Sequence, residues 1–530
     1  MKQKFFRIIS LISAFAVLIA GLSLTANAGG GDICSKGDNY TPIIIIHGEK
    51  TIFKDNEDGT STALFDDGEY VSEILDGAAP LIAKGILTGN WQPYSDHVLE
   101  VTGRAFDDFA PSPDGEIPSN THGVLWTPNK ISAAHSDASF YEYWPDVRLS
   151  PFDAAADIAK YVSTVREKTG HTKVNIVGRC EGSVFAMAYM YLYERMNDYQ
   201  NVGSLILSDP TLWGVRYTEA IFSGTVHINA ADASAFLKTY DLTSLLGEKY
   251  TKAIHAVIKI LNDTYGIEIT ASVLNRMYRE LKDVLFAPLL RQYYARTLGP
   301  WGCVYRDFDK ALEYIFPTAE LQEEYAVIIE KAIRFHNEIA LRSGDIITDM
   351  MDKGVSFADI AEYGYPQYPL YDDACEIGNY LTGVRQKSCG ATVSRMDSTL
   401  SESYIKSRID AGYGQYISPD RQIDASTALF PNHTWFIKNV AHIFTPVQEY
   451  EFLRAFSRGE VGDVFSSETY PQFLNYDPDA PILLPAQEKN PNDVVIELSF
   501  PEKVKAFFRT LINKIRDLFS FIPTANDIRT

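Results

Sequence analysis

The stretch Val174–Ser183 reads VNIVGRCEGS. Its apolar start runs directly into Gly178-Arg179-Cys180-Glu181-Gly182, and the apolar segment 184–195 follows. A strand that enters Gly-x-nucleophile-x-Gly and leaves into a helix is typical of a nucleophile elbow, a sharp turn that lifts the nucleophile above a sheet. Most elbows of this shape carry serine, whereas this one carries cysteine. The stretch predicts an α/β fold with Cys180 at a reactive position.

The elbow also predicts how the thiol would be activated. A helix N-terminus and a nearby imidazolium both lower the pKa of a thiol, and Arg179 would add to this if its side chain points inward. A thiolate produced in this way accepts acyl groups. The backbone N–H of Glu181 would supply one oxyanion donor. That of Glu49 or its neighbour, in the loop after His47-Gly48, would supply the other.

A general base is expected after the last strand. The segment 434–440 reads TWFIKNV and is followed by Ala441-His442, so His442 is the candidate, with His433 as a weaker alternative. The order nucleophile, acid, histidine is the order of this type of site. We place Asp420 first as the acid that orients His442. The alternatives that stay open are Asp372, Asp373, Asp424 and Asn379.

Strand and helix patterns alternate along the chain, which indicates a parallel sheet. The expected strands are 41–48, 173–177, 202–207, 355–362 and 434–440, and the expected helices include 152–168, 184–195 and 448–458. The region 216–354 has helical periodicity and no convincing strand, so we interpret it as an insertion. The core would then comprise 29–215 and 355–458, followed by a linker at 459–500.

The N-terminus resembles a secretory signal peptide, because basic residues, an apolar run and Ala26-Asn27-Ala28 succeed one another over residues 1–28. The net charge is −21, and removal of 1–28, which holds three basic residues and no acidic ones, makes it −24. Such a charge argues against a nucleic-acid partner. No CxxC or CxxH pair exists, so we do not expect a structural zinc site. The thiol chemistry expected at Cys180 implies neither a metal nor an organic cofactor.

Two features lie outside the expected core. The region 501–530 contains apolar residues at helical spacing and, over 501–523, five basic and two acidic residues. It either docks on the core or lies on an anionic membrane surface. Among the five cysteines, Cys375 and Cys389 are close in sequence and form the most plausible disulfide, the alternative being free thiols.

Five segments together resemble the α/β-hydrolases of the lipase and lecithin:cholesterol acyltransferase-like group. They read PIIIIHG (42–48), YEYWPDVRLSPFDAA (141–155), KVNIVGRCEGS (173–183), SPDRQIDAST (418–427) and TWFIKNVAH (434–442). The family usually has His-Ser where this chain has Arg179-Cys180, although cysteine elbows occur in dienelactone hydrolases and polyhydroxyalkanoate synthases. The resemblance implies an α/β-hydrolase fold, a mostly parallel sheet flanked by helices, with 216–354 as a helical lid.

The resemblance also implies a function. We expect a secreted esterase or acyltransferase that acts on carboxylic, lipid-like esters through Cys180, His442 and Asp420. Contact with the membrane surface is expected if 501–530 lies on it. The competing hypothesis is a hydrolase scaffold without turnover that binds a lipid or protein at the cell envelope. The acidic Glu181 beside the expected oxyanion hole favours this alternative.

Overall fold

The computed structural model describes residues 41–48, 52–64, 73–74, 77–124, 140–239, 266–442 and 445–488. The expected signal peptide at 1–28 and the region 501–530 lie outside the described residues. No helix within the described ranges has the length and apolar character needed to cross a membrane.

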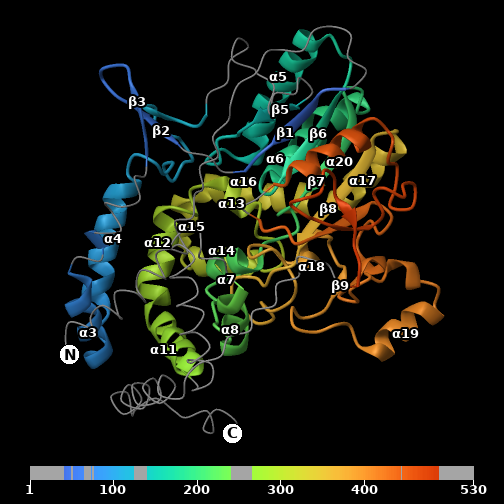
Figure 1. Ribbon diagram of the computed structural model, residues 1–530. Coiled ribbons are helices and arrows are strands. Elements are labelled where there is room, and N and C mark those ends of the chain that lie inside the picture. The colour runs from blue at the N-terminus through green and yellow to red at the C-terminus, as the bar shows by residue number, and fades with distance from the viewer. Residues whose placement is uncertain are drawn as a thin grey trace.

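An eight-stranded sheet forms the centre of the molecule, in the order β13-β12-β11-β8-β7-β6-β1-β5 (Figure 1). All neighbours pair in parallel except β12 and β13, which are antiparallel. This is an α/β fold, as expected. The strands are β1 (Ile43–Ile46), β5 (Phe140–Tyr143), β6 (Val174–Arg179), β7 (Val202–Ser208), β8 (Ser356–Tyr363), β11 (Thr434–Lys438), β12 (Phe473–Asn475) and β13 (Leu484–Pro485).

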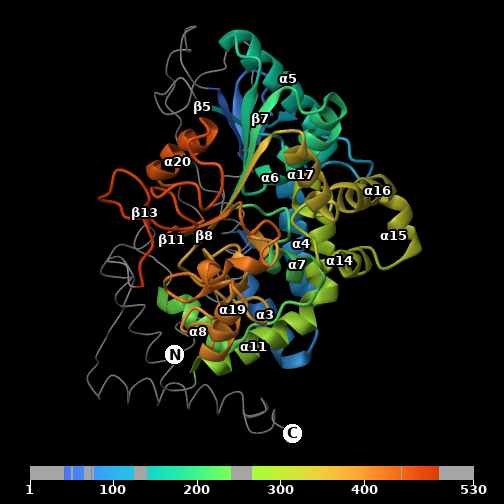
Figure 2. The same ribbon diagram turned by 90° about the vertical axis from the view of Figure 1, so that its right-hand side faces the viewer.

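Helices cover both faces of the sheet. Alternate residues of a strand point to opposite faces, so each strand contributes to two packed layers. Ile44 and Ile46 of β1 pack with α5 (Pro151–Thr169), α6 (Gly182–Tyr189) and α17 (Ser343–Asp352), whereas Ile43 and Ile45 pack with α20 (Val447–Ser457). Figure 2 shows α20 on one side and α5, α6 and α17 on the other. The continuous apolar run of β1 therefore reflects burial on both faces.

Helix α5 has clear sequence signals at both ends. The Ser150 side chain accepts a hydrogen bond from the backbone of Asp153, and Pro151 occupies the first helical position. Gly170 ends the helix with φ at 72°, a conformation that glycine adopts at low cost. These signals explain why the expected range 152–168 matched the observed helix closely.

The described part of 216–354 is helical and contains no strand, as the periodicity predicted. A second hydrophobic core forms around Trp301, Phe308 and Phe316. The helices are α7 (Arg216–Phe222), α8 (Ala230–Thr239), α11 (Gly266–Leu281), α12 (Ala287–Gln292), α13 (Leu298–Trp301), α14 (Phe308–Ile315), α15 (Ala319–Glu324), α16 (Ala326–Phe335) and α17, with π-helical turns η4 (Lys282–Phe286) and η5 (His336–Ala340).

The helical region also receives a contribution from the N-terminal part of the chain. Helices α3 (Ala78–Thr88) and α4 (Gln92–Phe106) share a core with Leu281 and Leu285 of the insertion. Both views show α3 and α4 beside α11 rather than beside the sheet (Figures 1 and 2). The region 29–215 is therefore divided between the sheet and the helical body.

Between β8 and β11 the chain forms a smaller body with little regular structure. It contains α18 (Val384–Lys387), β9 (Thr392–Val393), α19 (Glu402–Asp410) and β10 (Ile423–Asp424), where β9 and β10 pair with each other. A further small sheet, β2 (Phe53–Asp55), β3 (Ser61–Ala63) and β4 (Thr121–His122), follows β1. The body between β8 and β11 borders the carboxyl edge of the main sheet through Lys387, which donates to the backbone of Glu362.

Two expectations require correction. The region 459–500 is not merely a linker in its described part, because β12 and β13 extend the main sheet and Leu474 and Leu483 are buried. Strands of two and three residues give no readable periodicity, which explains the miss. Cys375 and Cys389 are free thiols rather than a disulfide.

Candidate active site

Cys180 lies at the turn between β6 and α6, at the carboxyl end of the sheet. Its φ is 52°, an unusual value for a residue with a side chain. The turn is held by hydrogen bonds from the Cys180 N–H to the Ser208 carbonyl and from the Ser183 N–H to the Cys180 carbonyl, both 3.0 Å. A backbone held in a sparsely populated region is a recurrent feature of functional sites.

The two glycines of the elbow are needed for packing. A Cβ on Gly182 would overlap the carbonyl of Ile46 and lie 2.6 Å from its carbonyl carbon, so α6 begins directly against the end of β1. A Cβ on Gly178 would lie 2.8 Å from the Cα of Ser183. The Gly-x-Cys-x-Gly spacing thus permits strand, turn and helix to pack closely.

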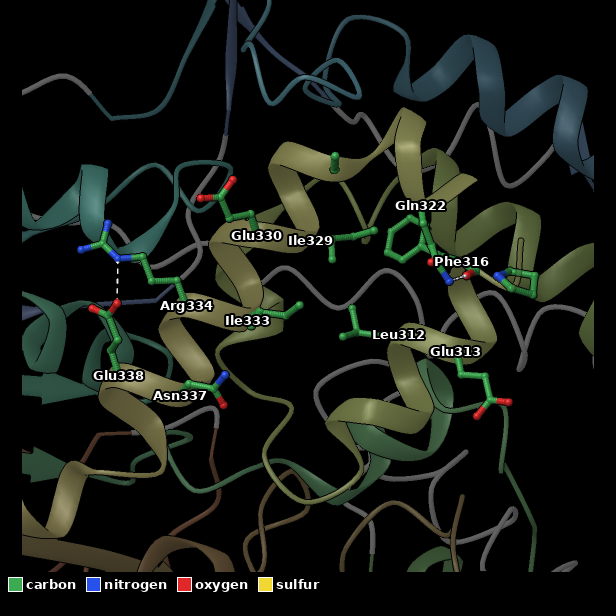
Figure 3. Close-up of a pocket in the computed structure, with 12 residues that line it drawn as sticks. Leu312, Glu313, Phe316, Gln322, Ile329, Glu330, Ile333, Arg334, Asn337 and Glu338 are labelled. Atoms are coloured by element: carbon green, nitrogen blue, oxygen red, sulfur yellow. Dashed lines mark hydrogen bonds and ion pairs between the residues drawn. The ribbon is translucent and has the colours of Figure 1, made fainter. Parts of the chain in front are cut away.

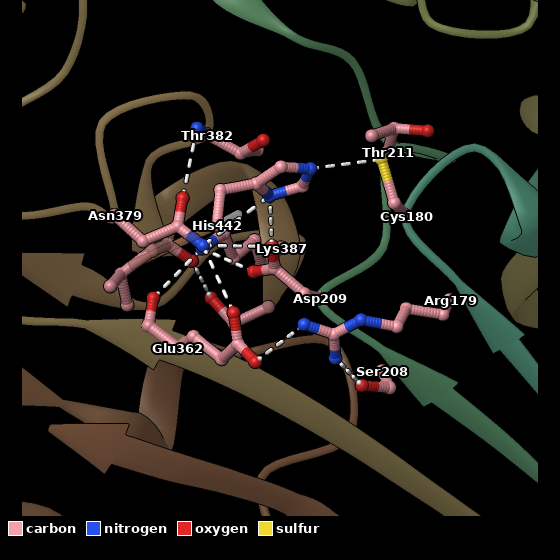
Figure 4. Close-up of polar contacts among 12 residues, drawn as sticks. Arg179, Cys180, Ser208, Asp209, Thr211, Glu362, Asn379, Thr382, Lys387 and His442 are labelled. Carbon is pink, nitrogen blue, oxygen red and sulfur yellow. Dashed lines mark hydrogen bonds and ion pairs between the residues drawn. The ribbon is translucent and has the colours of Figure 1, made fainter. Parts of the chain in front are cut away.

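Three side chains form a hydrogen-bonded chain at the elbow (Figure 4). The Nε2 of His442 lies 3.1 Å from the Sγ of Cys180. The Nδ1 of His442 hydrogen-bonds to the Oδ2 of Asp209. The backbone N–H of His442 donates to the Asn379 carbonyl at 3.0 Å, which ties the main chain at His442 to the segment that carries Asn379. Cys180 and His442 are thus brought together as the sequence predicted.

Asp209 directly follows β7, the strand adjacent to β6. It is 0% exposed and also has a positive φ, 51°. Its Oδ2 accepts a second hydrogen bond from the Nδ2 of Asn379 at 2.8 Å, and its Oδ1 pairs with the ammonium of Lys387. Both oxygens of the carboxylate are therefore occupied by buried groups.

The charges of this site shift one another. Burial acts to raise the pKa of Asp209, but the opposing effects of Lys387 and His442 lower it below its ordinary value. Burial acts to lower the pKa of His442, yet the Cys180 sulfur and Asp209 outweigh burial and raise that pKa to about 10. The arrangement therefore favours the imidazolium form of His442 beside the ionised Asp209 carboxylate.

Asp420 does not orient His442, contrary to our first choice. Its carboxylate accepts hydrogen bonds from Ser418 at 2.6 Å and Tyr363 at 3.1 Å and pairs with Lys438 at 3.2 Å. Asp209 is not among the acids that the sequence pattern predicts, because those acids all lie late in the chain, nearer to the histidine. The signal was available: in VGSLILSDP (202–210) the aspartate stands at the end of a buried strand next to the elbow strand.

The other acid candidates have partners elsewhere. Asp372 pairs with His227 at 2.8 Å, Asp373 is exposed, and Asp424 binds Arg408 at 2.8 Å. Asn379 alone among the alternatives belongs to the site, since it donates to Asp209 and its Nδ2 lies 3.4 Å from the Nδ1 of His442. His433 precedes β11 and therefore lies at the opposite end of that strand from His442.

Arg179 does not act on Cys180 as a free positive charge. Its guanidinium donates to Ser208 at 2.9 Å and pairs with Glu362 at 3.1 Å and Glu449 at 3.4 Å, below the elbow (Figure 4). Burial raises the pKa of Glu362 to about 8, against the lowering effect of Arg179. Arg179 is therefore part of a buried ion network that ties β6 to β8 and α20.

The expected oxyanion donors are described in part. Gly48, two residues after the end of β1, approaches the elbow closely, because a Cβ on it would lie 3.5 Å from the backbone nitrogen of Glu181. Glu49 lies outside the described residues. The Glu181 carboxylate turns toward the helical insertion, since a Cβ on Gly299 of α13 would lie 2.5 Å from its Oε1.

The helical insertion packs directly on the elbow. Gly302 allows α13 to approach Val184 of α6, and the Cys303 thiol donates to the Thr211 hydroxyl at 3.3 Å. Burial and the nearby Glu181 carboxylate raise the pKa of Cys303 well above its ordinary value. Cys303 is therefore a protonated, buried thiol in the cover of the site.

The Asp146–Arg148 segment, which carried part of the family resemblance, has a structural role. Asp146 accepts hydrogen bonds from the Arg148 side chain at 3.0 and 2.8 Å, and Arg148 also donates to Thr121 at 2.7 Å and the Phe109 carbonyl at 3.2 Å. Arg148 is buried. The pair ties the segment before α5 to Phe109, shortly after α4, and to strand β4.

A groove of about 830 Å³ lies on the helical insertion (Figure 3). Its apolar floor includes Leu312, Phe316, Ile329 and Ile333, and none of its lining residues belongs to the Cys180 site. Among the described residues, no cluster of histidine, cysteine and acidic side chains is suited to hold a metal ion. Neither a protein-family model nor a curated protein matches this chain.

Proposed function

We propose that this chain is an α/β-hydrolase that transfers the acyl group of a carboxylic ester to water or an alcohol through a thioester on Cys180. The observation that carries the proposal is the chain Cys180–His442–Asp209 at the carboxyl edge of the sheet. The order nucleophile, acid, histidine and the strained elbow are both typical of this fold. The helical insertion packed on the elbow is consistent with a lid.

The proposed reaction has two half-reactions. The thiolate of Cys180 attacks the acyl carbon, and the carbonyl electron pair moves to the oxygen. This oxyanion accepts a hydrogen bond from the backbone N–H of Glu181. The tetrahedral intermediate collapses, the C–O bond breaks, and the His442 imidazolium protonates the departing alkoxide. His442 then removes a proton from water or an alcohol, which attacks the thioester and releases Cys180. Asp209 stays ionised and holds the His442 ring.

Substrate class and location rest on the family resemblance and the signal-like N-terminus. We propose a lipid-like ester as substrate and a secreted protein, with the basic region 501–530 as a contact to membrane. No cofactor is part of the mechanism.

The test is to trap the acyl-enzyme. Purified protein is incubated with 4-nitrophenyl esters of increasing chain length, and nitrophenolate release and the intact mass are both recorded. We expect turnover and an acyl adduct on Cys180, both absent in Cys180→Ala, and retained turnover in the matched Cys303→Ala variant. If no ester yields turnover or adduct, a binding scaffold without catalytic activity becomes the better account.

A further inference from the structure

The carboxylate of Asp209 is held from the side opposite His442 by a lysine that the proposed mechanism does not use. We propose that Lys387 is a positioning residue, whose buried ammonium keeps Asp209 ionised and aimed at His442. The proposal rests on the proposed function for its role in ester turnover. Its structural part, control of the Cys180–His442 pair, is testable without any ester.

The side chain of Lys387 is buried and has two polar partners. It ends α18 in the body between β8 and β11, and its side chain is 0% exposed. Its ammonium pairs with the Oδ1 of Asp209 and donates to the Glu362 carbonyl at 2.8 Å. A long flexible side chain loses much conformational freedom when it is buried, so a fixed lysine requires strong partners. Asp209 is the partner that carries opposite charge at contact distance.

Asp209 needs this cation because other acids surround it. The Nδ2 of Asn379 bridges the two carboxylates, 2.8 Å from the Oδ2 of Asp209 and 3.2 Å from the Oε2 of Glu362. Asp209 in turn raises the pKa of the buried Asp359 of β8, and Asp209 and Glu449 both raise the pKa of Glu362. The facing cations are Lys387, His442 and Arg179. Removal of one cation from such a cluster favours proton uptake by a carboxylate.

The consequence reaches Cys180 through His442. An ionised Asp209 accepts a hydrogen bond from the Nδ1–H of His442, which leaves Nε2 directed at the sulfur. Without Lys387, Asp209 takes up a proton more readily. A protonated Asp209 stabilises the His442 imidazolium less, so a smaller fraction of Cys180 is thiolate. The midpoint of the acidic limb of Cys180 alkylation should therefore move to higher pH.

The chain provides a matched control in a second buried lysine–aspartate pair. Lys438 lies 3.2 Å from Asp420, and the two side chains are 10% and 6% exposed. This pair lies outside the hydrogen bonds of His442. Lys438→Met therefore breaks a comparable buried ion pair while Asp209 keeps its contacts.

The experiment measures the rate of iodoacetamide labelling of Cys180 against pH, by peptide mass spectrometry, in the full chain and its variants. In Lys387→Met we expect a rate at pH 7 lowered about tenfold, the size of coupling found within one hydrogen-bond network, with an upward shift of the midpoint. Lys438→Met should match the wild type within about twofold, as expected for a residue that does not share partners with the site. Adding Lys387→Met to Asp209→Asn should produce little further loss, because the lysine acts through Asp209.

A second variant keeps the proposal testable if Lys387→Met does not fold. Lys387→Gln retains a hydrogen-bond donor and loses the charge, and it should show the same shift in midpoint. Equal and independent losses from Lys387 and Asp209 variants, or an unshifted midpoint in a folded Lys387 variant, would overturn the proposal. Absence of ester turnover alongside a Lys387-dependent midpoint would reject the proposed function and leave the positioning role intact.

Discussion

Asp209 and Asp420 are two buried aspartates in similar surroundings, yet only one serves His442. Each lies near the carboxyl edge of the sheet and pairs with a buried lysine, Lys387 for Asp209 and Lys438 for Asp420. Asp209 directs its second oxygen to the imidazole, whereas Asp420 binds Ser418 and Tyr363. Two similar aspartate–lysine pairs thus have different roles, because the two aspartates lie in different parts of the fold.

The comparison teaches that sequence distance is a poor guide in a parallel sheet. Asp209 lies 233 positions from His442, but it follows β7, which neighbours the elbow strand β6. Asp420 lies much nearer in sequence, in a loop body whose packing directs its carboxylate elsewhere. Because the carboxyl ends of parallel strands meet at one edge, strand order decides which side chains meet.

The largest expected effect separates the two aspartates in catalysis. In Asp209→Asn the amide presents the wrong partner to the Nδ1 of His442, and the loss of turnover should approach the value of about 10⁴ known for such a change in a serine protease. Asp420→Asn should stay within about threefold of the wild type, because its carboxylate touches no member of the site. Steady-state ester hydrolysis by both variants checks this, and equal losses would contradict the assignment of Asp209.

The next expected effect is on the unfolding free energy, and it concerns the Asp420–Lys438 pair. Asp420→Asn leaves Lys438 without its charged partner and weakens two hydrogen bonds, so we expect the unfolding free energy to fall by about 3 kcal/mol. Lys438→Met in the Asp420→Asn background should recover part of this loss, because the unpaired buried charge is removed as well. Urea titrations measure both. Simple addition of the two losses would mean that the pair is not coupled.

The pKa of His442 offers a third contrast. The value of about 10 depends first on Cys180 and then on Asp209 once burial is overcome. In Cys180→Ala and in Asp209→Asn the pKa should therefore fall by at least about one unit, while Asp420→Asn should leave it unchanged. NMR titration of labelled histidine, with His442→Ala to assign the signal, provides the values. An unchanged pKa in Cys180→Ala would contradict a thiolate–imidazolium pair.

A smaller effect concerns Glu362, which shares Asn379 with Asp209. Its pKa is about 8 in the folded protein against an ordinary 4.5, so the folded state keeps a proton that the unfolded chain releases between these values. Stability from this group is thus complete below pH 4.5 and declines as pH rises toward 8. Glu362→Gln should reduce this decline by about 1 to 3 kcal/mol. Urea titrations at pH 5 and pH 8 measure the decline in unfolding free energy between the two pH values. The same decline in the variant and the wild type would refute this prediction.

The sequence predicted the parts of the molecule that have local signals. The buried run of β1, the caps of α5, the Gly-x-Cys-x-Gly turn and His442 at the end of β11 all follow from residues near one another. The order of strands, the choice of Asp209 and the inward placement of Lys387 do not, since they depend on how distant segments meet. The two-residue strand β13 and the free thiols Cys375 and Cys389 were likewise beyond local patterns.

The central claim is that Cys180 and His442 act as one unit. The most direct measurement is the pH dependence of iodoacetamide labelling of Cys180 in the wild type, in His442→Ala and in the control His433→Ala, whose histidine lies at the other end of β11. The account predicts fast labelling near pH 7 in the wild type and in His433→Ala, and slow labelling in His442→Ala. Slow labelling in all three proteins, indifferent to His442, would contradict it.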